Sequence, residues 1–203
     1  MEEKIARLIS WILHPLLMPS YALLLQFYLK PFYVVLFPSG MRTALAVIFI
    51  GNTVLLPAII IWLMRQRNVI SDIQLPERRE RTFPFIIAVI TYTVTYFMLV
   101  RKGLPPVYLK LLLGGAILIS VSLLVNMFWK ISLHMVGIGG LAGIFAGLMY
   151  TGLLHAPGVL ILSLLLAGFT GFARLKLNTH NEAQVYTGFI AGAAIMFLVF
   201  TLR

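Results

Sequence analysis

The sequence contains no cysteine in its 203 residues. This absence excludes a disulfide framework, a thiol nucleophile and a thiolate metal site. Charged residues are also scarce, at 11% of the chain, and only 6 of them are Asp or Glu. Because soluble globular domains carry about 25% charged residues, the composition excludes that class of protein.

Apolar residues take their place: 61% of the chain is hydrophobic, and the mean hydropathy is +0.98. A bilayer core needs about 20 apolar residues per transmembrane helix, and such stretches follow one another almost end to end. We therefore expect an all-α polytopic bundle of about six to seven transmembrane helices, forming one integral membrane domain over residues 1–203. The expected spans are Ile9–Leu29, Thr43–Met64, Phe83–Val100, Tyr108–Trp129, Leu133–Leu153, Pro157–Ala173 and Val185–Leu202. The apolar run 32–37 is too short to cross a bilayer.

The chain has a net charge of +10 at pH 7. Its basic residues lie at the ends of the expected helices, where they meet anionic headgroups. We therefore expect anionic lipids as partners, no nucleic acid, and a location in a bacterial inner membrane. The oligomeric state and the side of the membrane that each loop faces stay open.

Three polar clusters interrupt the apolar sequence. They are residues 78–84 within "LPERRERTFP", residues 130–134 with the sequence "KISLH", and residues 174–184 with the sequence "RLKLNTHNEAQ". If each span crosses once, the crossings alternate and all three clusters reach the same membrane face. Ionisable groups at membrane depth are costly and commonly functional. We therefore expect the clusters to converge on one site.

The residue types in these clusters are those of a phosphate site. Arg174 precedes His180 by six positions, and Ser132 and His134 stand where a helix begins. An arginine can bind two phosphate oxygens at once, a helix N-terminus offers free amides to an anion, and imidazole can act as nucleophile or proton donor. A zinc site is less consistent with the sequence, because the two histidines lack a well-placed third ligand, so we expect no metal.

With these residues the chain resembles the type 2 phosphatidic acid phosphatases, whose motifs are Lys-x6-Arg-Pro, Pro-Ser-Gly-His and Ser-Arg-x5-His-x3-Asp. Arg174-x5-His180 matches the third motif in residue type and spacing, and Ser132-x-His134 matches the second. The resemblance covers about 110 residues, 78–188. It implies the helical core of this family, that is, a PAP2-like core.

The chain departs from the family pattern at several positions. Gln184 stands where the family has the aspartate that orients the nucleophilic histidine, and Glu182 is the nearest carboxylate in sequence. Gln74 stands where the first-motif lysine would be. Arg78, Arg79 and Arg81 would have to supply the first-motif cations.

The resemblance implies metal-free and cofactor-free hydrolysis of a lipid phosphate. His180 would attack phosphorus to form a phosphohistidine, and His134 would protonate the leaving lipid oxygen. The residues implied to hold the phosphate are Arg174, Arg81, Arg78, Arg79, Ser132 and Lys130, with Gln184 and Glu182 as candidates to orient the nucleophile. Phosphatidate, phosphatidylglycerol phosphate, a polyprenyl diphosphate and a lipid A phosphate all fit. The alternative is a weakly active or inactive relative that serves as a phospholipid-binding scaffold or transporter component.

Two further features of the sequence indicate helix geometry and packing and not a catalytic role. His14 stands between apolar residues and beside Pro15, which favours a kinked first helix over a catalytic role. Glycines recur every four residues at Gly139, Gly143 and Gly147, and again at 188 and 192. This spacing permits close helix packing, and we expect it inside the bundle.

Overall fold

The computed structural model describes residues 1–72, 75 and 77–202, and all the regular secondary structure in this part of the chain is helical. Seven helical segments in this part of the chain are long and apolar enough to cross a membrane. They are Glu2–Leu29, Ser39–Gln66, Arg79–Val100, Pro106–Phe128, Leu133–Tyr150, Pro157–Lys176 and Glu182–Thr201. The expected all-α class and number of spans are confirmed, and the segments indicate an integral membrane protein.

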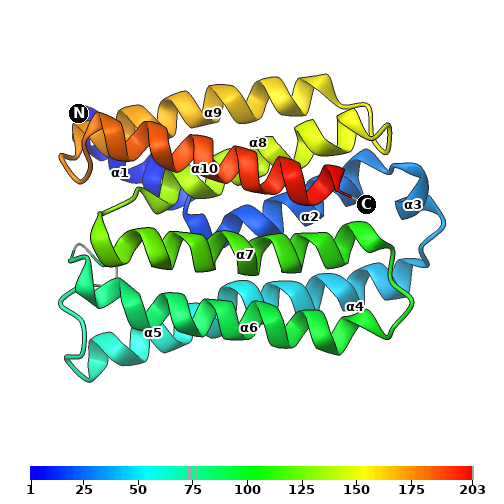
Figure 1. The fold of residues 1–203 in the computed structure, drawn as a ribbon, viewed down its shortest axis with the longest axis horizontal. Helices are drawn as coiled ribbons and strands as arrows, with labels where there is room; N and C mark the ends of the chain where they lie inside the picture. The colour runs from blue at the N-terminus through cyan, green and yellow to red at the C-terminus, as the bar shows by residue number, and fades with distance from the viewer. Residues whose placement is uncertain (73–74, 76, 203) are drawn as a thin grey trace. The chain divides into compact units, whose positions relative to one another are not determined.

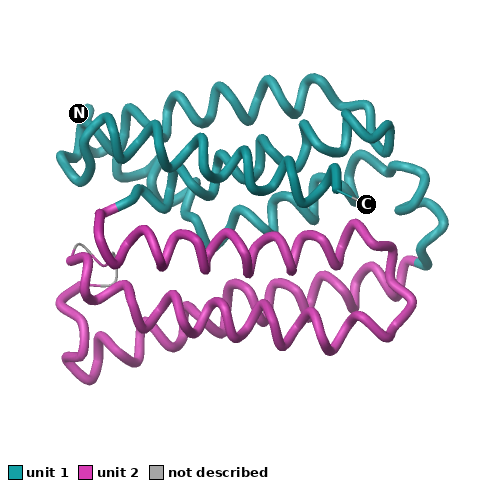
Figure 2. The backbone as a smooth tube through the Cα atoms, viewed as in Figure 1, with its two compact units in different colours: residues 1–38, 131–203 teal, residues 39–130 magenta. Residues whose placement is uncertain are grey.

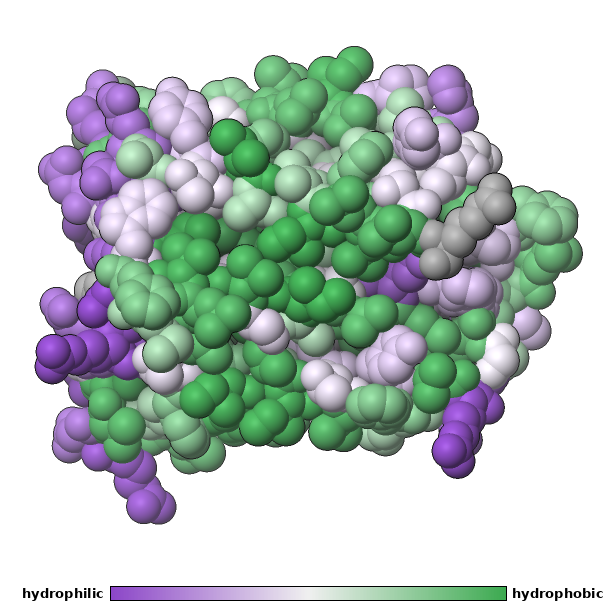
Figure 3. Space-filling model, in the orientation of Figure 1, coloured by the Kyte–Doolittle hydropathy of each residue, from purple (hydrophilic) through white to green (hydrophobic). Residues whose placement is uncertain are grey.

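Apolar side chains cover the sides of these helices, and hydrophilic ones gather toward the helix ends (Figure 3). Large side chains such as Trp11, Phe97 and Leu165 are more than half exposed. In a soluble protein such exposure would be a liability. On membrane-spanning helices it is the surface that lipid covers.

The chain forms two compact units (Figure 2). Unit 1 consists of residues 1–38 and 131–203, and unit 2 consists of residues 39–130. Unit 1 therefore joins the two ends of the chain, and unit 2 is one continuous stretch between them. Whether residues 1–203 act as one domain stays a prediction, and each unit is described by itself.

Unit 2 contains α4 (Ser39–Ile50), the π-helix η2 (Gly51–Leu55), α5 (Leu56–Gln66), the 3₁₀ turn η3 (Arg79–Arg81), α6 (Thr82–Val100) and α7 (Pro106–Phe128). The π-helix precedes Pro57, which has no N–H to donate to the preceding turn, so the widened turn fits this proline. Helices α6 and α7 pack on each other. The Tyr92 ring lies against Gly115, where a Cβ would come within 2.7 Å of its Cδ1.

Unit 1 contains α1 (Glu2–Ile12), the 3₁₀ turn η1 (Pro15–Leu17), α2 (Met18–Leu29), α3 (Phe32–Val35), α8 (Leu133–Tyr150), α9 (Pro157–Lys176) and α10 (Glu182–Thr201) (Figure 1). The first span is broken where His14 caps η1, since its Nδ1 accepts the Leu16 N–H at 3.3 Å. The expected kink is confirmed. The short run at 32–37 forms only α3.

Helix α8 is the central helix of unit 1, packed against α10, α9, α2 and η1. Its glycines allow α10 to approach until backbone meets backbone. A Cβ at Gly139 would overlap the Phe189 carbonyl, and a Cβ at Gly192 would overlap the Val136 carbonyl. The glycine repeat therefore works inside the bundle, as its spacing predicts.

We expect Gly192→Ala to lower the free energy of unfolding by about 1–3 kcal/mol, because the added methyl group has no space between the two helices. Gly168→Ala is the matched control, since Gly168 lies in α9 with open space around it. It should be neutral or raise stability by about 0.5–1 kcal/mol. Thermal unfolding in detergent measures both, and equal melting temperatures would contradict the close contact.

Candidate functional site

The sequence between Arg174 and His180 folds as the end of one helix and the start of the next. After α9 ends, Asn178 adopts the left-handed conformation with φ 51°. Its N–H bonds to the Leu175 carbonyl at 3.0 Å, and the Thr179 N–H bonds to the Arg174 carbonyl at 3.3 Å. This pair of bonds is a Schellman motif, which reverses the chain at a helix C-terminus. The six-residue spacing therefore places His180 back beside the last turn of α9.

Helix α10 starts with a capping box directly after His180. The Asn181 side chain accepts the Gln184 N–H at 2.9 Å, and Gln184 Oε1 faces the Asn181 N–H at 3.4 Å. The same Gln184 Oε1 lies 2.9 Å from His180 Nδ1. Since a backbone N–H can only donate, the atom facing it is the amide oxygen, and we assign the imidazole proton to Nδ1. Nε2 of His180 then carries the lone pair.

Arg174, in the last turn of α9, places a buried positive charge where α9 ends and the chain turns into α10. Its side chain is only 6% exposed. Its Nη1 donates to Ser10 Oγ at 3.1 Å, and the Ser10 hydroxyl in turn donates to the Ala6 carbonyl at 2.9 Å. A buried charge is stable only where polar groups meet it, and here a serine from the N-terminal helix supplies one of them.

The start of α8 completes the site. Ser132 is the N-cap residue and is fully buried, and its hydroxyl has no hydrogen-bond partner among the described residues. Its N–H bonds to the Gln184 carbonyl at 3.4 Å, which joins the starts of α8 and α10. His134 Nε2 lies 3.1 Å from the Ser10 carbonyl. Because a carbonyl only accepts, this imidazole carries its proton on Nε2.

These side chains form one group, which we call the histidine–arginine cluster: Ser10, His14, Ser132, His134, Arg174, His180 and Gln184. The His14 and His134 rings stand edge to face with centroids 5.5 Å apart. His134 is close enough to Arg174, His14 and His180 for electrostatic interaction. Residues 132–134 and 174–184 of the two sequence clusters are thus brought together within unit 1, whereas Lys130 falls in unit 2.

The remaining predicted phosphate ligands belong to unit 2. Arg81 is buried, and its Nε donates to the Leu75 carbonyl at 2.8 Å. The Arg78 carbonyl accepts Asn126 Nδ2 at 3.0 Å, which ties the loop before α6 to the end of α7. Lys130 is half-buried.

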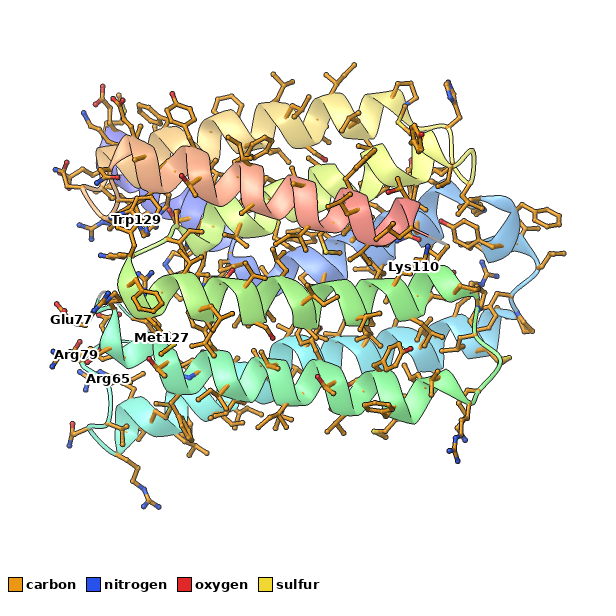
Figure 4. The ribbon with its side chains drawn as sticks, viewed as in Figure 1. Arg65, Glu77, Arg79, Lys110, Met127 and Trp129 are labelled. Atoms are coloured by element: carbon orange, nitrogen blue, oxygen red, sulfur yellow. The ribbon has the colours of Figure 1, made fainter. Side chains whose placement is uncertain are left out.

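Arg79 is exposed and lies with Arg65 and Glu77 at one end of unit 2, opposite Lys110 (Figure 4). Gln74 lies outside the described residues. Convergence of the cluster at 78–84 with the other two stays a prediction.

Sequence reasoning missed Ser10 and assigned His14 to structure alone. His14 does cap η1, but its ring also lies against His134. In the sequence, Ser10 is a single hydroxyl residue in a segment of mixed polarity, which does not mark it as functional. Its contacts with α8 and α9 become visible only in the folded structure. Glu182 is exposed in the first turn of α10, and Gln184 makes the contact with His180. No group of three His, Asp or Glu side chains in the described part of the chain is placed to hold a metal ion.

Comparisons with protein-family models, with curated protein sequences and with solved structures found no match. The class that the fold and the site define is a helical membrane protein with seven candidate spans and a buried histidine–arginine cluster at one end of unit 1.

We expect Arg174→Lys to weaken orthovanadate binding about tenfold, because one ammonium cannot reproduce the two-pronged contact of a guanidinium. Lys176→Gln is the matched control. Lys176 lies two residues away on the same helix and is exposed, paired with Glu2. Calorimetric titration of the detergent-purified chain measures both. Unchanged affinity in Arg174→Lys would remove Arg174 from the ligand set.

Proposed function

We propose that the protein is a membrane lipid phosphatase that transfers the phosphoryl group of a lipid to His180 and then to water. The observation that carries the proposal is the bond between His180 Nδ1 and Gln184 Oε1, 2.9 Å long. It fixes the proton on Nδ1, which makes Nε2 the basic nitrogen of an imidazole that is only 7% exposed. A nucleophile held in one tautomer by a neighbouring acceptor is a common arrangement in covalent catalysis.

In the proposed first step, the Nε2 lone pair of His180 attacks phosphorus and the bond from phosphorus to the lipid oxygen breaks. The leaving oxygen takes a proton from His134. Since the Nε2–H of His134 is bonded to the Ser10 carbonyl, the proton comes from Nδ1 of the imidazolium. His134 returns to the neutral tautomer that the fold holds.

In the second step, water attacks the phosphohistidine. His134 Nδ1 accepts the water proton, the N–P bond breaks, and inorganic phosphate leaves. His180 regains its lone pair and His134 its proton, so the cycle consumes one water for each phosphate released. The Gln184 amide oxygen keeps the Nδ1–H of His180 oriented in both steps.

The phosphate oxygens would be held by Arg174, by the Ser132 hydroxyl and by the free amides at the start of α8. Buried donors aimed at a phosphoryl group stabilise its charge more strongly than exposed ones. The resemblance to type 2 phosphatidic acid phosphatases adds Arg78, Arg79, Arg81 and Lys130 to this set. Fully buried Ser132, with a hydroxyl that has no partner among the described residues, supports a ligand at this position.

A lipid substrate is proposed because most of the cluster lies at or beside the ends of membrane-spanning helices: Ser132, His134, Arg174, His180 and Gln184. Four lipids carry the phosphate group that the site would bind: phosphatidate, phosphatidylglycerol phosphate, a polyprenyl diphosphate and a lipid A phosphate. We place the enzyme in a bacterial inner membrane, where anionic lipids would surround its basic helix ends.

The second candidate is an inactive phospholipid-binding scaffold or transporter component. One observation favours it: Gln184 offers His180 a neutral amide oxygen, which stabilises an imidazolium less than a carboxylate would. Such a protein would bind the same headgroups and release no phosphate.

His180→Ala should abolish phosphate release from a panel of the four lipid phosphates, because the acceptor of the phosphoryl group is removed. The parent should keep its activity in chelator, since the proposed steps use no metal. His155→Ala is the matched control, as His155 is an exposed residue in the turn between α8 and α9. Robust release by His180→Ala would refute the mechanism, and no release by the parent would favour the scaffold.

Gln184→Glu should raise the turnover number several-fold, because it keeps the side-chain length and puts an anion beside the imidazole. The capping box should survive, since glutamate serves at this position as glutamine does. Glu182→Gln is the control and should change little, because Glu182 is exposed. A loss of turnover in Glu182→Gln, with no gain in Gln184→Glu, would reassign the orienting role to Glu182.

A further inference from the structure

We infer that Ser10 is a positioning residue of the phosphate site, and that helix α1 is therefore part of the catalytic apparatus. The inference rests on the proposed function, since it concerns the same cluster. None of the motifs that drew attention to the site lies in α1, whose part in it comes from the folded contacts alone.

The Ser10 side chain is oriented by its own helix. Its hydroxyl donates to the Ala6 carbonyl one turn back, at 2.9 Å. With the proton committed there, the oxygen lone pairs point away from the helix axis, and Arg174 Nη1 donates to this oxygen at 3.1 Å. Ser10 is 8% exposed and Arg174 is 6% exposed, so water competes little for this bond. The contact restricts the rotation of the long arginine side chain about its own bonds.

The Ser10 backbone reaches a second member of the cluster. Ser10 is in the last turn of α1, where carbonyl groups have no partner within the helix. Its carbonyl instead accepts the His134 Nε2–H at 3.1 Å. One residue thus holds the guanidinium through its side chain and fixes the imidazole tautomer through its main chain.

Packing contacts within unit 1 hold α1 in place. The helix packs against α9, and Ala6 is fully buried. Helix α1 ends at Ile12, and His14 then caps the start of η1. Ser10 is therefore presented from a fixed helix, which is what a positioning residue requires.

Ser10→Ala tests the role of the hydroxyl because it removes the contact with Arg174 and leaves the carbonyl in place. Loss of a hydrogen bond to a charged group should weaken orthovanadate binding about tenfold. With a lipid phosphate that the parent hydrolyses, KM should rise by a similar factor while kcat changes by less than about threefold, because the nucleophile is untouched. Ser10→Thr should restore affinity and KM, since it keeps the hydroxyl.

Ser163→Ala is the matched control. Ser163 is 2% exposed in α9, and its hydroxyl donates to the Val159 carbonyl at 2.8 Å in the same one-turn pattern. It should leave vanadate affinity unchanged. If Ser10→Ala yields no folded protein, Ser10→Cys makes the same comparison, because a thiol is a weaker acceptor of similar shape.

The outcomes separate the two proposals. Weaker vanadate binding in Ser10→Ala, without phosphate release by the parent, would support the positioning role and reject the phosphatase. Phosphate release by the parent, with unchanged affinity and KM in Ser10→Ala, would overturn the positioning role alone. Equal effects of Ser10→Ala and Ser163→Ala would assign Ser10 to helix stability. A parent chain that binds no vanadate would overturn both proposals.

Discussion

The backbone contact between α8 and α10 is the constraint on which the site depends. Where Gly139 and Gly192 lack side chains, carbonyl groups of one helix fill the space beside the other. Two helices this close cannot slide or rotate without steric overlap, so their register is fixed along the shared length. That register brings the Ser132 N–H to the Gln184 carbonyl, so the starts of the two helices lie side by side.

A second constraint is the lack of water in an apolar interior. Each polar group there needs a partner from the chain itself, and most buried hydroxyls find one in their own helix. Thr53, Ser122 and Thr170 all donate to the carbonyl four residues back. Ser10 follows the same pattern and also accepts from Arg174. Ser10 thus combines the common bond within its own helix with a bond to another helix.

The spans and the local part of the site could be predicted from sequence, because both depend on short-range order. Hydropathy locates the helices, and the contact of His180 with Gln184 is local, since His180 directly precedes the capping box that Asn181 and Gln184 form. The contribution of Ser10 could not be predicted in this way. It lies 164 residues from Arg174, and no local pattern shows which helix faces α9.

His14 shows which roles of a residue can be predicted from sequence and which cannot. Its position before Pro15 correctly predicts a break in the first helix, since proline restricts the backbone locally. Its proximity to His134 depends on how η1 packs against α8. A residue can thus be assigned correctly to one role from its neighbours in sequence while a second role stays hidden.

Because unit 1 joins residues 1–38 with residues 131–203, the order of synthesis separates its parts. Chains emerge from the N-terminus first, so α1 enters the membrane long before α8, α9 and α10 exist. During that interval Ser10 and His14 have none of their later partners from these helices. The cluster is complete only when the start of α10 has been synthesised, so a chain truncated directly after α9 lacks both His180 and Gln184. Formation of the cluster therefore requires that unit 1 has been synthesised at least as far as Gln184.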